Sequence, residues 1–147
     1  MKKRADGHDP FMPPTEFGRS LDGLTVNLLV TDMTRAVEFH TAVLGVEVVY
    51  SDPDITIVRG FGTRWMMHAD HAYDEHPLHE IANSAAQRGA GIELRLHGCD
   101  PDETADIAHA LGFTVLDGPR DQPDHGLREA HILDQDGYVW VADVPLG

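Results

Sequence analysis

Residues 24–60 of the chain read LTVNLLVTDMTRAVEFHTAVLGVEVVYSDPDITIVRG. The order is a β-branched run, an aspartate, an amphipathic segment, a Leu-Gly pair and two further β-branched runs. The same order returns in GIELRLHGCDPDETADIAHALGFTVLDGP at 91–119 and REAHILDQDGYVWVADV at 128–144. A repeated supersecondary unit determines an architecture before any single residue is weighed. The chain is therefore expected to hold two copies of one structural module.

In the first copy, the β-branched residues 25–31 predict a strand, and Asp32 is a natural N-cap for the helix that follows. The apolar stripe of this helix places His40 at its margin, and Gly45 is expected to end the helix. Three more strands are expected at residues 46–50, 55–60 and 64–70.

The second copy repeats this scheme. Residues 92–97 predict a strand, and Asp100 or Asp102 caps a helix that Gly112 ends. The remaining elements are a strand at 113–116, a polar loop at 120–126, and a hairpin that joins residues 129–133 to residues 138–143. An Asp-Gly pair in the connection suits a tight turn of this hairpin.

The two copies set the domain organisation. Residues 1–23, rich in proline and glycine, predict an N-terminal arm without regular structure. Residues 24–147 form one domain, with module one at 24–70 and module two at 91–144. Residues 71–90 link the modules and include a short helix at 78–88. The fold class is α+β: two βαβββ modules whose curved mixed sheets enclose a cleft, because a module alone leaves one sheet face uncovered.

Composition excludes several classes of partner. Against 11 basic side chains the chain has 25 acidic ones, for a net charge of −14. This charge repels phosphate backbones and anionic bilayers, so neither nucleic acid nor a membrane surface is an expected partner. Cys99 is the single cysteine, which fits a reducing compartment, and no stretch approaches the roughly 20 apolar residues of a membrane helix. A cytoplasmic homodimer is predicted, because the edge strands of such modules need cover.

These residues resemble the vicinal oxygen chelate superfamily, which includes glyoxalases, bleomycin-resistance proteins and extradiol dioxygenases. The resemblance covers about residues 22–144. It lies in NLLVTDMTRAVEFHTAVLGVEVVY and in GLREAHILDQDGYVWVAD. His40 stands where the family usually has tyrosine, and Gln135 where it usually has proline.

The resemblance implies four strand positions that hold a metal in metal-dependent members. They correspond here to Thr25, the region Met66–His68, Glu93 and Val141. Threonine and valine do not supply the imidazole, carboxylate or thiolate donors that Zn²⁺, Ni²⁺ or Fe²⁺ prefer. The chain is thus similar to the metal-free, bleomycin-resistance-like branch, and no cofactor is expected. A divalent metal at a displaced site formed by His68, Glu93 and His131 is the alternative.

Strand alternation predicts which side chains line the cleft. Glu93 and His68 are the candidates for proton transfer, since a carboxylate or an imidazole can act as a general base. The candidate ligand-binding residues are Thr25, Asn27, Arg64, Met66, Arg95, Glu129 and His131. A solvated sheet face, or a structural ion pair between Glu93 and an arginine, is the competing interpretation. Opposite parity assigns Tyr138 and Trp140 to the core.

Three functional hypotheses follow. The first is a small-molecule-binding protein of the glyoxalase and bleomycin-resistance type that holds an organic ligand in the cleft between the sheets. The second is a metal-dependent lyase, isomerase or dioxygenase with a site around His68 and Glu93. The third is an interaction module that works through its N-terminal arm. The sequence identifies no ligand and does not say whether a reaction is catalysed.

Overall fold

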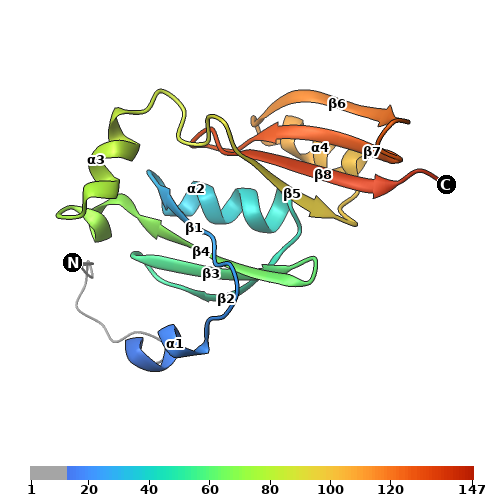
Figure 1. Cartoon of the computed structure of the whole chain (residues 1–147). Helices are drawn as coiled ribbons and strands as arrows, with labels where there is room; N and C mark the ends of the chain where they lie inside the picture. The colour runs from blue at the N-terminus through green and yellow to red at the C-terminus, as the bar shows by residue number, and fades with distance from the viewer. Residues whose placement is uncertain (1–12) are drawn as a thin grey trace.

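The computed structural model describes residues 13–147, which form two four-stranded mixed sheets (Figure 1). Sheet one has the order β1-β4-β3-β2 and sheet two the order β5-β8-β7-β6. The pairs β1 with β4 and β5 with β8 are parallel, and the other pairs are antiparallel. The strands are β1 (Asn27–Val30), β2 (Glu47–Ser51), β3 (Ile55–Gly60), β4 (Thr63–Ala69), β5 (Glu93–His97), β6 (Thr114–Gln122), β7 (Leu127–Leu133) and β8 (Val139–Pro145). This topology confirms the two βαβββ modules and the α+β class.

The two helices α2 and α4 begin after the aspartates that were predicted as N-caps. Asp32 caps α2 by accepting from the Arg35 N–H at 3.0 Å, and Asp100 caps α4 by accepting from Asp102 and Glu103. The helices are α1 (Pro14–Ser20), α2 (Met33–Glu38), the π-helix η1 (Phe39–Val43), the 3₁₀ helix η2 (Asp70–Tyr73), α3 (Pro77–Ser84) and α4 (Pro101–Ala110). Each module therefore carries its long helix between its first and second strands.

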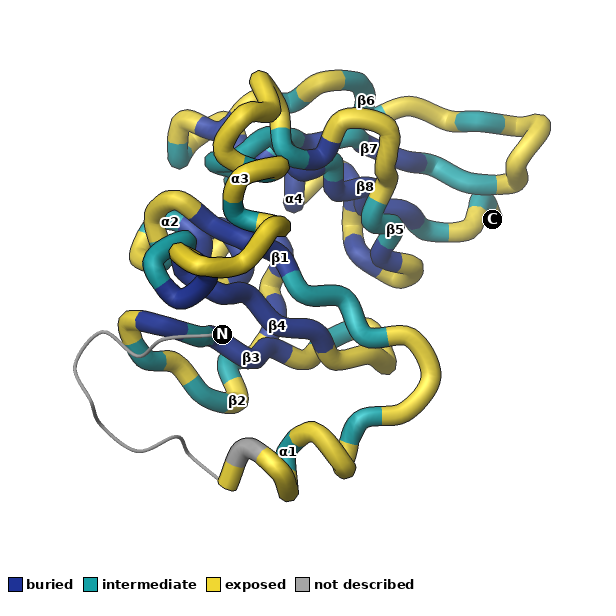
Figure 2. Tube along the Cα trace, turned by 60° about the vertical axis from the view of Figure 1, so that its left-hand side comes forward, coloured by how far each residue is buried: buried dark blue, intermediate teal, exposed yellow. Residues whose placement is uncertain are grey.

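One hydrophobic core joins the two modules. It takes side chains from the helix-bearing faces of both sheets and from α2, η1 and α4. Phe39 packs edge-on against Phe113 of module two at 4.9 Å, and Trp65 lies 5.5 Å from Trp140, between ring centroids. Figure 1 shows α2 between the two sheets, and Figure 2 shows that the strands beside it are buried while α1 is exposed. Because the helix-bearing faces meet, the other faces of the two sheets, called here the open faces, are turned outward.

Four expectations about the elements were wrong. Residues 14–20 of the predicted irregular arm form α1, while residues 1–12 lie outside the described residues. The linker helix ends at Ser84 instead of reaching residue 88. Strand β6 continues to Gln122 through two register shifts, so only the tip of the predicted loop 120–126 is a turn. His40 is fully buried and not marginal, because the π-helix turns it inward.

The linker between the modules packs tightly against the β7–β8 turn. A Cβ atom added at Gly89 lies 2.5 Å from the Cα of Tyr138 and 2.8 Å from the carbonyl oxygen of Gly137. The replacement Gly89→Ala is therefore expected to lower the free energy of unfolding by about 1–3 kcal/mol, as overpacking does. Gly18→Ala, where nothing lies within 4 Å, is the matched control. Equal stability of the two variants in urea denaturation contradicts this close contact.

No helix among residues 13–147 is both long enough and apolar enough to cross a membrane.

Candidate functional site

The open face of sheet two carries a connected set of charged side chains. Side chains that lie opposite one another on neighbouring strands point to the same face of a sheet. Arg95 of β5 and His131 of β7 both lie opposite Val141 of β8, so the three share this face. Arg95 donates to Glu129 at 2.5 Å, to Glu93 at 3.2 Å and to Asp143 at 3.3 Å. His131 bonds to the second oxygen of Glu93 at 2.8 Å. One guanidinium thus joins three carboxylates.

The depth of these groups differs. The side chains of Glu129 and Asp143 are 5% and 1% exposed, so both carboxylates are held out of water beside Arg95, which is 29% exposed. Glu93 is 47% exposed and faces solvent. Its hydrogen bond to His131 lowers the pKa of Glu93, opposed by partial desolvation and assisted by Arg95. Glu93 is therefore an ionised acceptor at neutral pH at the accessible end of the network.

The open face of sheet one carries a second, smaller set. The Asn27 side-chain oxygen lies 2.6 Å from Nδ1 of His68, and its amide nitrogen donates to the Tyr73 hydroxyl at 2.8 Å. Because an amide oxygen only accepts, Nδ1 of His68 carries the hydrogen. His68 is 6% exposed and stands edge-on to the Tyr73 ring. Arg64, on the same strand as His68, lies 5.9 Å from the Phe17 ring centroid of α1.

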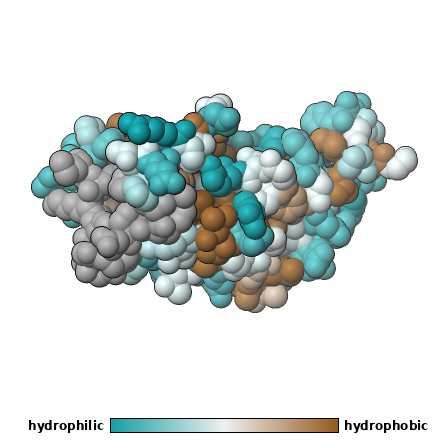
Figure 3. All heavy atoms as spheres, turned by 90° about the horizontal axis from the view of Figure 1, so that it is seen from below, coloured by the Kyte–Doolittle hydropathy of each residue, from teal (hydrophilic) through white to brown (hydrophobic). Residues whose placement is uncertain are grey.

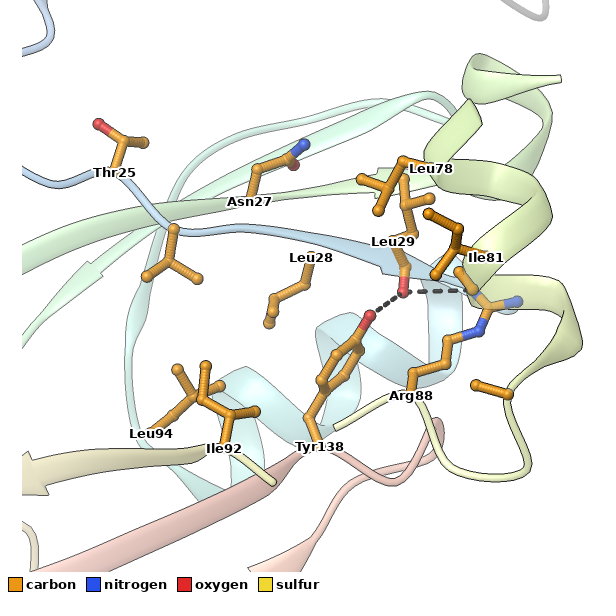
Figure 4. A pocket seen from close by; sticks show the side chains of 13 residues that line it. Thr25, Asn27, Leu28, Leu29, Leu78, Ile81, Arg88, Ile92, Leu94 and Tyr138 are labelled. Atoms are coloured by element: carbon orange, nitrogen blue, oxygen red, sulfur yellow. Dashed lines mark hydrogen bonds between the residues drawn. The ribbon is translucent and has the colours of Figure 1, made fainter. Parts of the chain in front are cut away.

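A pocket of about 400 Å³ separates the outer edges of β1 and β5 (Figure 4). Leu28 and Leu94 enter it from strands of the two sheets, and the Tyr138 ring stands at one side of it. The Tyr138 hydroxyl and Arg88 both donate to the carbonyl oxygen of Leu29, at 2.9 and 3.3 Å. These bonds occupy one carbonyl of the β1 edge. Most of the remaining pocket wall is apolar, with Thr25 and Asn27 as polar members, and Ile81 and Ile92 are 68% and 51% exposed.

Comparison with known protein families identifies the family to which this fold belongs. The model of the Glyoxalase/Bleomycin resistance protein/Dioxygenase superfamily matches residues 24–142. The chain belongs to this superfamily. No curated protein sequence matches it.

Several solved structures share the fold. A glyoxalase/bleomycin resistance protein/dioxygenase family enzyme from Burkholderia phytofirmans PsJN superposes with a TM-score of 0.69 at 19% identity, over 83% of this chain and 97% of that one. TnmS3, an antibiotic-binding protein from Streptomyces sp. CB03234, gives 0.58 at 20% identity, over 86% and 98%. TioX from Micromonospora sp. ML1 gives 0.60 at 21% identity, over 84% and 95%.

The structure divides the predicted site residues of this superfamily member between two faces. Glu93, Arg95, Glu129 and His131 form one connected group on sheet two. On sheet one, Asn27 and His68 are in contact, Met66 is 6% exposed, and the exposed Arg64 lies 5.9 Å from the Phe17 ring of α1. Thr25 precedes β1 and lines the pocket. The open faces turn outward, so the two groups do not meet within one chain.

The residues at the four family metal positions do not fit a metal of the usual kind. Thr25 and Val141 lack suitable donors, and Val141 is buried with 1% exposure. Among residues 13–147, no three histidine, cysteine, aspartate or glutamate side chains gather closely enough to hold an ion. In the displaced set, Glu93 and His131 touch, while His68 belongs to the other sheet.

Sequence reasoning missed three members of these groups. Asp143 lies two residues after Val141 on β8 and so points to the same face, where it bonds to Arg95 and His97. Strand alternation alone could have predicted this position. Tyr73 comes from a 3₁₀ turn that has no periodic signal. Arg88 reaches the β1 edge from the linker, with its guanidinium paired to Asp70 at 2.6 Å, and nothing in the local sequence marks it.

Proposed function

We propose that the protein binds a small organic ligand on its open sheet faces, as a binding protein of the glyoxalase and bleomycin-resistance type that works without the family's usual metal. The observation that carries the proposal is the network on sheet two. Glu93, Arg95 and His131 leave accessible hydrogen-bonding atoms on a face that no helix of the described chain covers. Family membership and the fold shared with an antibiotic-binding protein support this interpretation.

We further propose that the working form is a cytoplasmic homodimer. One chain turns its two open faces outward, so a cleft bounded by both kinds of face takes sheet one from one copy and sheet two from another. No strand among residues 13–147 pairs with the outer edges of β1 and β5, although Tyr138 and Arg88 bond to one β1 carbonyl, and strand edges without a neighbouring strand favour pairing with another chain. The side of the molecule on which α1 and sheet one lie also shows apolar side chains among hydrophilic ones (Figure 3). Light scattering of the full chain tests this: a monomer at all concentrations contradicts it.

Ligand binding is tested by amide chemical-shift mapping, with bleomycin as the first probe and a panel of aromatic and peptide antibiotics after it. We expect shifts in β1, β4, β5, β7 and β8, and little change in α2 and α4. Glu93→Gln is expected to weaken binding about tenfold or more, because it removes a charged hydrogen-bond acceptor. Glu103→Gln, at an exposed position of α4, is the matched control. Binding that moves only helix resonances, or that ignores Glu93→Gln, contradicts the proposed site.

A second candidate function, a metal-dependent lyase, isomerase or dioxygenase, rests on the contact of Glu93 with His131. In the proposed dimer, His68 of one copy would complete their donor set. Elemental analysis of untagged protein decides between the candidates. A transition metal at full occupancy that is lost in His131→Ala supports the enzyme, and metal content below stoichiometry in the wild type contradicts it.

A further inference from the structure

The two tryptophans of the chain are equivalent by the internal repeat and meet at the centre of the molecule. Trp65 precedes Met66, which pairs with Asn27 of β1, and Trp140 precedes Val141, which pairs with Arg95 of β5. Their ring centroids are 5.5 Å apart with 34° between the planes. Trp65 belongs to module one and Trp140 to module two. The stack is therefore a direct contact across the boundary between the modules.

Each indole N–H is bound by a buried titratable group of its own module. Trp65 donates to Nε2 of His40 at 3.0 Å, and Trp140 donates to Asp134 at 3.0 Å. His40 also touches the partner tryptophan, with its ring 5.1 Å from Trp140 at 84°. A change at His40 is thus transmitted to both indoles.

The hydrogen bonds fix the state of His40. An indole N–H only donates, so Nε2 of His40 accepts, and Nδ1 carries the hydrogen that goes to the Ala36 carbonyl oxygen at 2.9 Å. Both ring nitrogens are used, and the ring is fully buried. A second proton on Nε2 would point at the N–H of Trp65, so two donors would face each other. The protonated ring cannot keep the present arrangement.

No charged side chain among residues 13–147 contacts the His40 ring to stabilise a proton there. Its ring neighbours are Phe39 of its own helix, Trp65 of β4 and Trp140 of β8. The Asp134 carboxylate bonds to the indole of Trp140. Cys99 and Tyr138 belong to the same core, and burial raises the pKa of both, so both are neutral in the acid range. We propose that His40 makes the contact between the two modules sensitive to acid, so that its protonation breaks the bond to Trp65 and separates the tryptophan pair. The open faces belong to different modules, so their relative position changes with it.

The pH window follows from the buried groups. Desolvation lowers the pKa of His40 to about 4, although the hydrogen bond to the Ala36 carbonyl oxygen raises this pKa. The unfolded chain then binds more protons than the native one between about 6.5 and 4, so stability falls as the pH falls through this range. Burial raises the pKa of Asp134 to about 6, although Trp140, Asp136 and Tyr138 donate to it. Asp134 acts in the opposite direction, since its contribution to stability is lost as the pH rises through about 6.

The experiment follows the coupled circular-dichroism signal of the two stacked indoles in the full chain as the pH falls, beside the far-ultraviolet signal of the secondary structure. We expect the indole signal to disappear near pH 4 while the secondary structure persists. In His40→Gln, whose amide offers one donor and one acceptor, we expect no separate transition. We also expect the stability of this variant to fall less than that of the wild type from pH 6 to pH 4, because the substitution removes the contribution of His40 and leaves that of Asp134. The exposed His109→Gln on α4 is expected to behave like the wild type.

Should His40→Gln fail to fold, proton NMR of the wild type gives the answer. The ring protons of His40 and the indole N–H of Trp65 are expected to move with one common midpoint. The proposal is overturned if the two groups titrate separately, or if the indole signal and the secondary structure of the wild type are lost together. It is also overturned if His40→Gln keeps the separate transition.

Discussion

Replacing Trp140 with alanine is expected to lower the free energy of unfolding by about 3–5 kcal/mol, the range for a large aromatic side chain in a packed core. Trp140 is 2% exposed and contacts Phe39, His40 and Trp65 of the other module. The cavity therefore opens where both modules contribute atoms. The substitution also removes the indole donor from the buried carboxylate of Asp134. Urea denaturation, followed by the fluorescence of the remaining Trp65, measures the loss.

Two control variants separate the causes. Trp140→Phe keeps most of the ring and removes the N–H, so we expect a smaller loss of about 1–2 kcal/mol. Leu116→Ala, at a side chain that is 56% exposed, is expected to change stability by less than about 0.5 kcal/mol. A loss below about 1 kcal/mol for Trp140→Ala contradicts a shared core. A biphasic transition in the wild type does so as well, since two independent modules would unfold separately.

The fold was predictable because the repeat and the alternation are both long-range patterns. Trp140 and Tyr138 were assigned to the core by parity alone, and both are buried. The same alternation placed Arg95, Glu129 and His131 on one face, and the hydrogen bonds among them and Glu93 confirm that placement. A period of two is robust wherever one sheet face must be buried.

Prediction failed where a local irregularity changed the period. The helical stripe assumed 3.6 residues per turn, whereas the π-helix Phe39–Val43 shifts the phase and moves His40 from the margin into the core. In β6 the strand was predicted to end at residue 116, shortly before Gly118 and Pro119. The strand instead shifts register there, and Arg120 again pairs with Glu129. Glycine and proline mark bulges as well as turns, and the sequence does not distinguish the two.

The orientation of the modules was beyond sequence reasoning for a different reason. Either face of a sheet can meet the other module, and only side-chain packing decides between them. Arg35 of α2 stacks on Phe113 at 3.7 Å and donates to the Leu111 carbonyl oxygen, which fixes helix against helix. The outward direction of the open faces follows from such contacts. This direction is why Glu93 and His68, placed in one cleft by sequence, lie on separate faces of a single chain.

Arg95→Met is expected to lower the free energy of unfolding at pH 7 by about 3 kcal/mol. Methionine fills a similar volume but leaves the buried carboxylates of Glu129 and Asp143 without their cation. Breaking a buried ion pair costs about 3–5 kcal/mol, and the 29% exposure of Arg95 places this case at the lower end. Chemical denaturation at pH 7 measures the effect.

A double variant identifies the cause of that loss. Arg95→Met combined with Glu129→Gln removes one of the stranded charges, so it is expected to be more stable than Arg95→Met alone by about 1–2 kcal/mol. Arg128→Met, on the same strand as Glu129 but paired with the exposed carboxylates of Asp102 and Asp121, is expected to have little effect. A double variant less stable than the single one shows that Arg95 acts through packing instead of charge. If the double variant recovers this stability, the guanidinium is fixed by its ion pairs with the buried carboxylates, and the hydrogen-bonding groups on the open face of sheet two are held in a rigid arrangement.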